Sequence, residues 1–217
     1  MRKVAILMCA VLAGVSVALQ ANSDRLKDAT AVLTEMAGSF DAGIPKDLLN
    51  KAECVVIIPG VKKGAIGFGG QYGRGYMACR NNGAWSAPSG MRIEGGSVGF
   101  QIGGSSTDVI LLVMNTRGAD KLLSSKFTVG ADAAVAAGPL GRQASAQTDA
   151  TMHAEMLAWS RSRGVFAGIS LQGSTLRSDG SENKELYGKA LSAKDIVRGG
   201  VKVPAAAKEL MAVLGKY

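Results

Sequence analysis

The apolar residues that follow position 22 recur with a helical period. They stand three and four positions apart, the spacing of one face of an α-helix: Leu26, Ala29, Leu33 and Met36. Asn22 or Ser23 can cap this helix at its N-terminus. We therefore predict an amphipathic N-terminal helix that ends at Gly43, with an apolar stripe that either packs onto the rest of the domain or lies on a bilayer.

A different pattern begins at residue 54, where a run of mostly β-branched residues extends to Pro59. Such a continuous apolar run is typical of a strand buried on both faces. Glycines then alternate with apolar residues in four segments: 62–76, 95–104, 128–138 and 164–173. A strand with few side chains allows another backbone to approach closely. These segments predict tightly packed strands of one β-rich body.

Turn signals divide the strands further. We predict a turn near Gly60, a hairpin at Asn81-Asn82-Gly83, and strands over 91–102 and 107–114 that are separated by the glycines and serines of 103–106. Two more strands are expected over 127–137 and 165–171.

Helical spacing predicts a helix over 148–161, through Met152, Met156, Leu157 and Trp159. Shorter helices are expected at 45–52, 117–125, 183–187 and 193–197, with a last one from Pro204. The predicted fold class is α+β. We expect a single domain with a glycine-rich, mostly antiparallel sheet or barrel-like body, flanked by the N-terminal amphipathic helix and the C-terminal helices.

The first 21 residues have the pattern of an export signal. Arg2 and Lys3 precede an uncharged apolar run over 4–19, and Ala18 or Ala21 offers a small residue for cleavage. We expect residues 1–21 to be a signal peptide and 22–217 to be one domain in the periplasm or cell envelope. Cys9 follows the bulky Met8, which disfavours lipid attachment.

Charge and cysteine content narrow the function. Without Arg2 and Lys3, 23 basic and 17 acidic side chains leave a net charge of +6. The charges are scattered, which argues against nucleic acid and for a weak attraction to anionic surfaces. Cys54 and Cys79 form an even pair, which in an exported protein suggests a disulfide. The alternative is two buried thiols on neighbouring strands.

The usual residues of a catalytic or metal site do not come together in the sequence. His153 is the only histidine, so a two-histidine metal site is excluded, and no nucleophile is specified within its reach. The glycine spacing fits neither a dinucleotide-binding motif nor a P-loop. We expect no enzyme activity, no metal and no cofactor.

Several basic residues are candidates for binding an anion. Arg142, Arg161 and Arg163 lie at the ends of predicted elements, where a guanidinium can fork onto phosphate oxygens, or where it can simply be a solvated cation at a helix end. Lys62 and Lys63 precede the glycine-rich segment that carries Arg74. The backbone N–H groups there can hold an anionic headgroup, or the glycines can serve strand packing alone.

Six segments, in order along the chain, resemble the SYLF domain family. They are 85–89 (WSAPS), 106–113 (STDVILLV), 127–131 (FTVGA), 138–142 (GPLGR), 162–174 (SRGVFAGISLQGS) and 187–188 (YG). The resemblance runs from about residue 23 to residue 214.

The resemblance implies a non-enzymatic domain that binds membrane lipids, in particular phosphoinositides, and in fungal relatives actin filaments. In the family, lipid binding is associated with the N-terminal amphipathic helix and nearby basic residues, which here correspond to Arg25, Lys27, Lys62 and Lys63. We expect this chain to carry an export signal in place of the SH3 or FYVE partner domain of eukaryotic members. We therefore expect an anionic phospholipid membrane as the partner, reached by apolar insertion and cationic contact. The alternative is a structural or protein-interaction module that assembles in the envelope.

Overall fold

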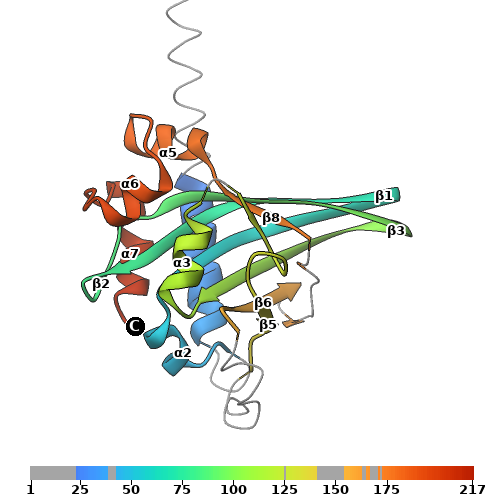
Figure 1. The fold of residues 1–217 in the computed structure, drawn as a ribbon, viewed down its shortest axis with the longest axis horizontal. Coiled ribbons are helices and arrows are strands. Elements are labelled where there is room, and N and C mark those ends of the chain that lie inside the picture. Colours follow the sequence, from blue (N-terminus) through green and yellow to red (C-terminus); the bar gives the residue numbers. More distant parts are fainter. Residues whose placement is uncertain are drawn as a thin grey trace, which may run out of the picture.

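The computed structural model describes residues 23–38, 43–124, 126–140, 154–162, 165–166, 171 and 173–217. Within these residues the strands form one sheet with the order β2-β1-β3-β6-β5, while β4, β7 and β8 pair beside this path. Figure 1 shows helices packed around the sheet. The predicted fold class, a single α+β domain with mostly antiparallel strands, is confirmed.

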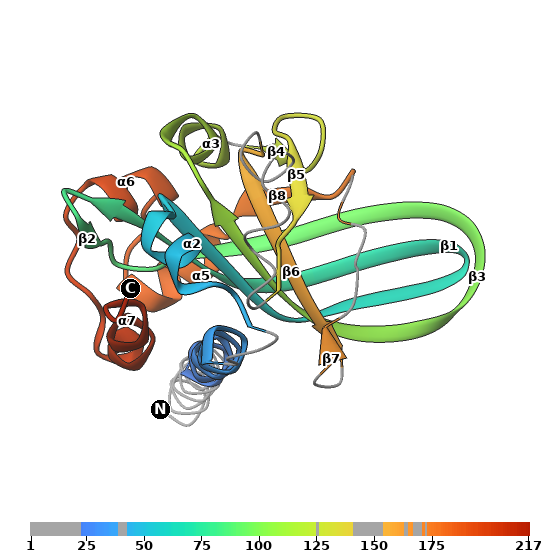
Figure 2. The ribbon, with the colours of Figure 1, turned by 90° about the horizontal axis from the view of Figure 1, so that it is seen from below.

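Two long strands, β1 (Cys54–Asn81) and β3 (Ser89–Val113), form the centre of the sheet. Each strand runs out from the body and returns, so that the hairpin of β1 lies inside the hairpin of β3 (Figure 2). The two strands pair antiparallel along both branches, from Cys54↔Val113 to Met77↔Ser89.

Two breaks predicted within these strands are wrong. Gly60 forms a bulge rather than a turn, with a φ of 55° and a register shift between Ile58 and Val61. Residues 103–106 continue the ladder, and Gly104 pairs with Gly64. The ladder uses main-chain hydrogen bonds, so small residues that resemble a loop are compatible with a continuous strand.

The glycines of β1 allow its two branches to touch, as the pattern predicted. A methyl group on Gly75 would overlap the carbonyl oxygen of Ile57 and lie 2.8 Å from the Cα atom of Ile58. A methyl group on Gly64 would meet nothing within 4 Å. Close backbone packing therefore depends on Gly75 and not on every glycine of the strand.

The predicted Asn-Asn-Gly hairpin is confirmed. β1 turns into β2 (Ala84–Trp85) with Arg80 paired to Trp85, and Asn82 and Gly83 have φ values of 52° and 85°. Positive φ at both central residues is the geometry that favours Asn-Gly in a two-residue turn.

The helix predicted over 148–161 is wrong in its described part, because β6 (Met156–Ser162) is a strand. β6 pairs antiparallel with β3 from Val113↔Met156 to Asp108↔Arg161. The apolar residues of this segment suit a buried strand as well as a helix, and pairing with β3 decides between them. Residues 148–153 lie outside the described part.

The smaller strands complete the sheet. β5 (Val135–Ala137) runs parallel to β6, and β7 (Val165–Phe166) pairs antiparallel with it. β8 (Thr175–Ser178) pairs with β3 and with β4 (Phe127–Thr128). The strand predicted over 127–137 is thus two short strands, joined by a turn in which Gly130 has a φ of 84°.

The predicted short helices are present, and capping side chains define several of their ends. They are α2 (Lys46–Lys51), α3 (Thr116–Leu122), α5 (Gly180–Tyr187), α6 (Ala193–Arg198), the 3-10 turn η2 (Ala205–Ala207) and α7 (Lys208–Leu214). Asn115, Asp179 and Ser192 each accept a hydrogen bond from the first turn of the helix that they cap. Such caps satisfy backbone donors that the helix itself leaves free.

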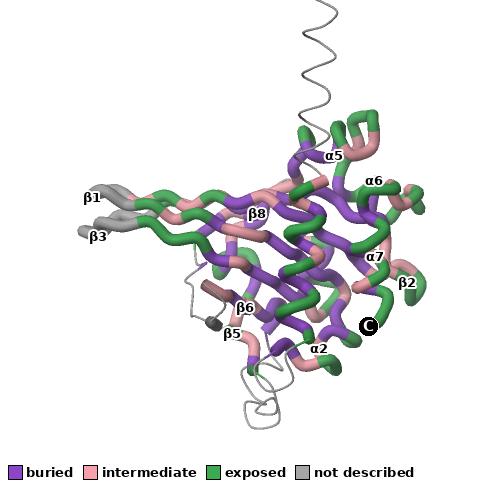
Figure 3. The backbone as a smooth tube through the Cα atoms, turned by 180° about the vertical axis from the view of Figure 1, so that it is seen from behind, coloured by how far each residue is buried: buried purple, intermediate pink, exposed green. Residues whose placement is uncertain are grey.

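The sheet separates two buried clusters. The N-terminal helix (residues 23–38) and α7 pack on one face, and α3 and α6 pack on the other, as Figure 2 shows. Figure 3 shows the buried positions concentrated where the helices cover the sheet. Leu26, Leu33 and Met36 are at most 1% exposed. The apolar stripe of the N-terminal helix therefore faces the sheet, as the packing alternative predicted, and apolar insertion of this helix into a membrane is contradicted.

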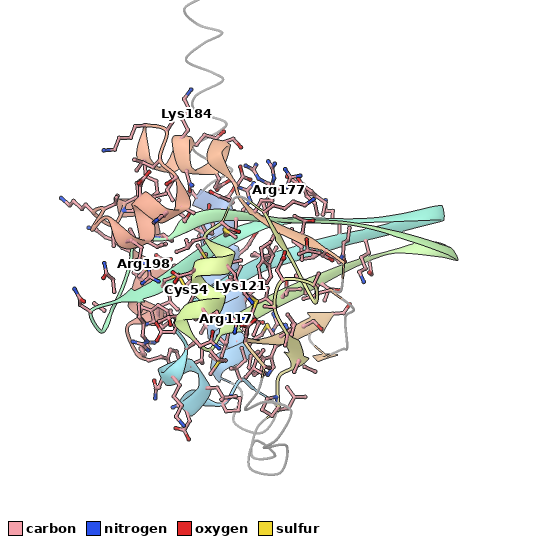
Figure 4. The ribbon with its side chains drawn as sticks, in the orientation of Figure 1. Cys54, Arg117, Lys121, Arg177, Lys184 and Arg198 are labelled. Carbon is pink, nitrogen blue, oxygen red and sulfur yellow. A yellow bond between two sulfur atoms is a disulfide. The ribbon has the colours of Figure 1, made fainter. Side chains whose placement is uncertain are left out.

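Cys54 and Cys79 form a disulfide, which settles the alternative in favour of the bonded pair. Their Cα atoms are 4.0 Å apart, and both residues are fully buried. The bond joins the two ends of β1; Figure 4 marks Cys54 in the body of the sheet.

Candidate functional site

A cleft of about 650 Å³ lies between the N-terminal helix and the sheet. The helix contributes Arg25, β1 contributes Lys62 and Arg74, and β6 contributes Arg161. Four of the eight basic residues predicted from the sequence therefore line one cleft, although they lie far apart in the chain.

Arg161 is held beside the cleft by two carboxylates. Its guanidinium donates to Glu35 of the N-terminal helix and, at 3.1 Å, to Asp108 of β3. Burial by itself would lower the pKa of Arg161, but the two carboxylates outweigh it and raise the pKa above its ordinary value. The guanidinium is thus charged and fixed between helix and sheet.

Arg74 is fixed by the start of α5. Its Nε donates to Asp179 at 2.6 Å and its Nη2 to Ser181 at 3.1 Å. The hydrogen bond to Asp179 raises the pKa of Arg74. Burial would raise the pKa of Asp179, but hydrogen bonds from Arg74, Ser181 and the backbone N–H of Glu182 hold it at about 2. The pair therefore stays charged across the neutral and mildly acidic range.

Glu182 is fully buried and joins three elements. It accepts hydrogen bonds from Arg25 of the N-terminal helix and from the hydroxyl of Tyr76 in β1. Its side chain lies on Gly90 of β3, where an added methyl group would come within 2.6 Å of the Cβ atom of Glu182. Burial, and then the charge of Glu182, raises the pKa of Tyr76 above its ordinary value, so the phenol remains a donor.

Two exposed side chains complete the cleft. Lys62 is exposed and forms no salt bridge with any residue in the described part of the chain. Tyr72 is 49% exposed, which is unusual for a large aromatic residue. The cleft thus presents an unpaired ammonium group and an aromatic ring beside three fixed guanidinium groups.

Of the other four predicted basic residues, the structure describes two, Lys27 and Lys63, and neither lines this cleft. Lys27 is exposed on the N-terminal helix, 3.8 Å from Asp24. Lys63 follows Lys62 in β1, so its side chain points to the opposite face of the strand. Arg142 and Arg163 lie outside the described residues, as do His153 and the predicted export signal.

Sequence reasoning missed a second group of basic residues, Arg92 in β3 and Arg177 in β8. They are cross-strand neighbours, and both contact Glu94. The alternation of β3 identifies Arg92 and Glu94 as residues of one face, but the pairing with Arg177 depends on a strand more than 80 positions away. Only the sheet register brings these residues together.

The described residues form neither a metal site nor a membrane-spanning helix. In that part of the chain, no group of three histidine, cysteine or acidic side chains is placed to hold a metal ion. None of the described helices is both long enough and apolar enough to cross a membrane.

Comparison with known proteins identifies the family of this chain. Residues 94–217 match the family described as "Ysc84: Las17-binding protein actin regulator". The chain is 38% identical over 176 residues to an SH3 domain-containing protein of Schizosaccharomyces pombe, covering 79% of this chain and 40% of that protein.

Two further relatives are similar over the same extent of the chain. LAS seventeen-binding protein 3 of Saccharomyces cerevisiae is 37% identical over 179 residues, 80% of this chain and 39% of its own length. The human SH3 domain-containing YSC84-like protein 1 is 32% identical, over 82% of this chain and 52% of its own length. The chain therefore spans about two fifths to one half of the relatives that it matches.

Proposed function

Because this chain belongs to the Ysc84 family, which is the SYLF domain family that its motifs resemble, we propose that it is a non-enzymatic module that binds anionic phospholipid at a membrane surface. The observation that carries the proposal is the cleft between the N-terminal helix and the sheet. It gathers Arg25, Lys62, Arg74 and Arg161 from three separate elements.

The cleft suits a polar headgroup in size and chemistry. Its volume of about 650 Å³ lies within the range of small-molecule sites, roughly 300–1,000 Å³. A guanidinium has five N–H donors, so even Arg74 and Arg161, each paired with two carboxylates, retain donors for a phosphate oxygen. Lys62 adds an ammonium group that forms no salt bridge with any described residue.

Acidic residues limit the attraction. Asp24, Asp28 and Asp108 also line the cleft. Binding therefore depends on where the cations are held and not on a large net charge. Contacts of this kind are exposed to solvent, so we expect them to weaken as the salt concentration rises.

The protein contacts the membrane without inserting its N-terminal helix, because the apolar residues of that helix pack against the sheet. The protein is then peripheral, with Tyr72 and Lys62 at the contact. We propose in addition that residues 1–21 direct export, so that the membrane is met from the periplasm or cell envelope.

Vesicle sedimentation tests the function. We expect the protein to pellet with vesicles that contain phosphatidylglycerol and not with neutral phosphatidylcholine vesicles. Lys62→Gln should weaken binding about fivefold, because a basic residue near an anionic surface contributes about 1 kcal/mol. Lys46→Gln, an equal charge change on α2 away from the cleft, should bind as the parent does. Equal, negligible pelleting with both vesicles would end the proposal.

A protein-interaction module is the second candidate. The names of the relatives favour it, since they describe a Las17-binding actin regulator and a LAS seventeen-binding protein. Co-sedimentation with purified actin filaments, and light scattering for self-assembly, test this candidate. Filament binding or a concentration-dependent oligomer, together with no vesicle binding, would make it the function of the chain.

A further inference from the structure

Three arginines form a row across three adjacent strands. Arg74 of β1 pairs in register with Arg92 of β3, which pairs in register with Arg177 of β8. Residues directly opposite in antiparallel strands share one face, so the three side chains emerge together. Two strand spacings separate the outer members by roughly 10 Å. In Figure 4, Arg177 lies among side chains that extend outward from the sheet.

Without carboxylate partners this row would oppose folding. Like charges placed directly opposite each other on a sheet are destabilising. The side chains are 24%, 32% and 41% exposed for Arg74, Arg92 and Arg177, so solvent only partly screens their repulsion. Like charges brought together at a partly exposed surface conflict with stability, and such local conflicts are expected at functional sites.

The available carboxylates do not satisfy the row equally. Arg74 has Asp179 and Glu182 within 3.2 Å. Arg92 and Arg177 share one carboxylate, Glu94, at 3.0 and 3.2 Å. The Nε atom of Arg177 is buried and has no hydrogen-bond partner in the described part of the chain. The excess positive charge therefore lies at Arg92 and Arg177.

We propose that Arg92 and Arg177 bind the phosphate group of an anionic phospholipid headgroup, with Arg74 as the fixed end of the row. The phosphate oxygens take bidentate hydrogen bonds from the two guanidinium groups and displace part of their contact with Glu94. The open sheet face fits a membrane surface better than a buried small molecule. Tyr72 stands two positions before Arg74 in β1, so its exposed side chain lies on the same face of the sheet.

This inference rests on the proposed function, but it uses different residues from the cleft test. Arg92→Gln/Arg177→Gln should lower affinity for phosphatidylglycerol vesicles about 25-fold, because each basic residue near the surface contributes a factor of about five. Arg117→Gln/Arg198→Gln removes the same charge from α3 and α6 and should change affinity less than twofold. Both variants should remain folded, which thermal unfolding checks.

Glu94→Gln gives the opposite expectation. If the carboxylate competes with phosphate for the same guanidinium groups, its removal should raise vesicle affinity threefold or more. No gain in affinity would contradict the competition and overturn the inference. Inorganic phosphate at constant ionic strength should also raise the melting temperature of the parent by more than that of the Arg92/Arg177 variant.

The outcomes separate the two proposals. Parent binding to anionic vesicles with an equal affinity for the Arg92/Arg177 variant would overturn this inference and leave the cleft proposal standing. Absence of parent binding to anionic vesicles would overturn both. Stabilisation by inorganic phosphate without vesicle binding would show that the row takes free phosphate, and the headgroup assignment would be wrong.

Discussion

Glu182 provides the sharpest test of how the N-terminal helix is attached, because one carboxylate serves three elements. Glu182→Ala removes one acceptor of the buried Tyr76 hydroxyl and one partner of Arg25 in the N-terminal helix. It also removes the second carboxylate of Arg74, which retains Asp179. The substitution should therefore loosen the helix without removing any apolar residue.

The magnitude follows from the burial of each partner. The buried phenol loses a charged acceptor, which costs about 2 kcal/mol. The Arg25 side chain is 21% exposed and partly screened by solvent, so the loss of this one ion pair adds about 1 kcal/mol. Arg74 adds little because Asp179 still pairs with it. The expected loss of about 3 kcal/mol corresponds to a fall of about 9 °C in the melting temperature of a domain of this size.

Urea unfolding measures this loss, with Glu185→Ala as the matched control. Glu185 lies in the same helix but is exposed, so its removal should change stability by less than about 0.5 kcal/mol. Hydrogen exchange should also become faster in residues 23–38 of the Glu182 variant only. A loss below about 1 kcal/mol, or unchanged exchange in that helix, would refute the role assigned to Glu182.

Three further outcomes test the fold. Gly75→Ala should destabilise the protein by about 2 kcal/mol or more because its methyl group meets backbone, whereas Gly64→Ala, measured by the same urea titration, should be near neutral. Reduction of the Cys54–Cys79 bond, which closes a loop with a sequence separation of 25, should cost about 3 kcal/mol in a thermal unfolding scan with and without reductant. The pKa of Asp179 is about 2 in the folded protein, below its ordinary value of 3.8. The ionised carboxylate therefore contributes about 2 kcal/mol to the free energy of unfolding above pH 4, and this contribution is lost as the pH falls towards 2. Asp179→Asn should therefore be less stable than the parent at pH 6 and equally stable at pH 2, and a difference that persists at pH 2 would contradict the assigned shift.

Features with a local cause could be predicted from the sequence. The Asn82-Gly83 turn follows from the two positive φ values that its geometry requires. The helices that begin after Asn115, Asp179 and Ser192 start within three residues of their predicted first residues. A capping side chain acts within one turn of the chain, so such a boundary has a local cause. The packed N-terminal helix likewise follows from the period of its own apolar residues.

Features that depend on distant pairing could not be predicted. Residues 156–162 have apolar side chains that suit either a helix or a strand, and β3 determines the outcome by pairing with them. The same applies to Gly64 and Gly104, which resemble loop residues until the ladder places them opposite each other. Of the candidate site, the basic residues of the cleft were identified one by one, but their carboxylate partners and the pair of Arg92 with Arg177 depend on the register of the sheet.

The cleft and the arginine row meet at one residue, and this determines which substitutions can test them. Arg74 lines the cleft, ends the row and anchors α5 through Asp179. Replacing Arg74 would change both surfaces and would also leave a buried carboxylate without its partner, so its effect on binding could not be separated from unfolding. Lys62 and Arg177 lie at the two ends of this continuous basic face, and neither is a partner of a buried carboxylate. Substituting Lys62 and Arg177 separately and together therefore tests whether one membrane contacts the whole face. If it does, the losses in binding free energy should add.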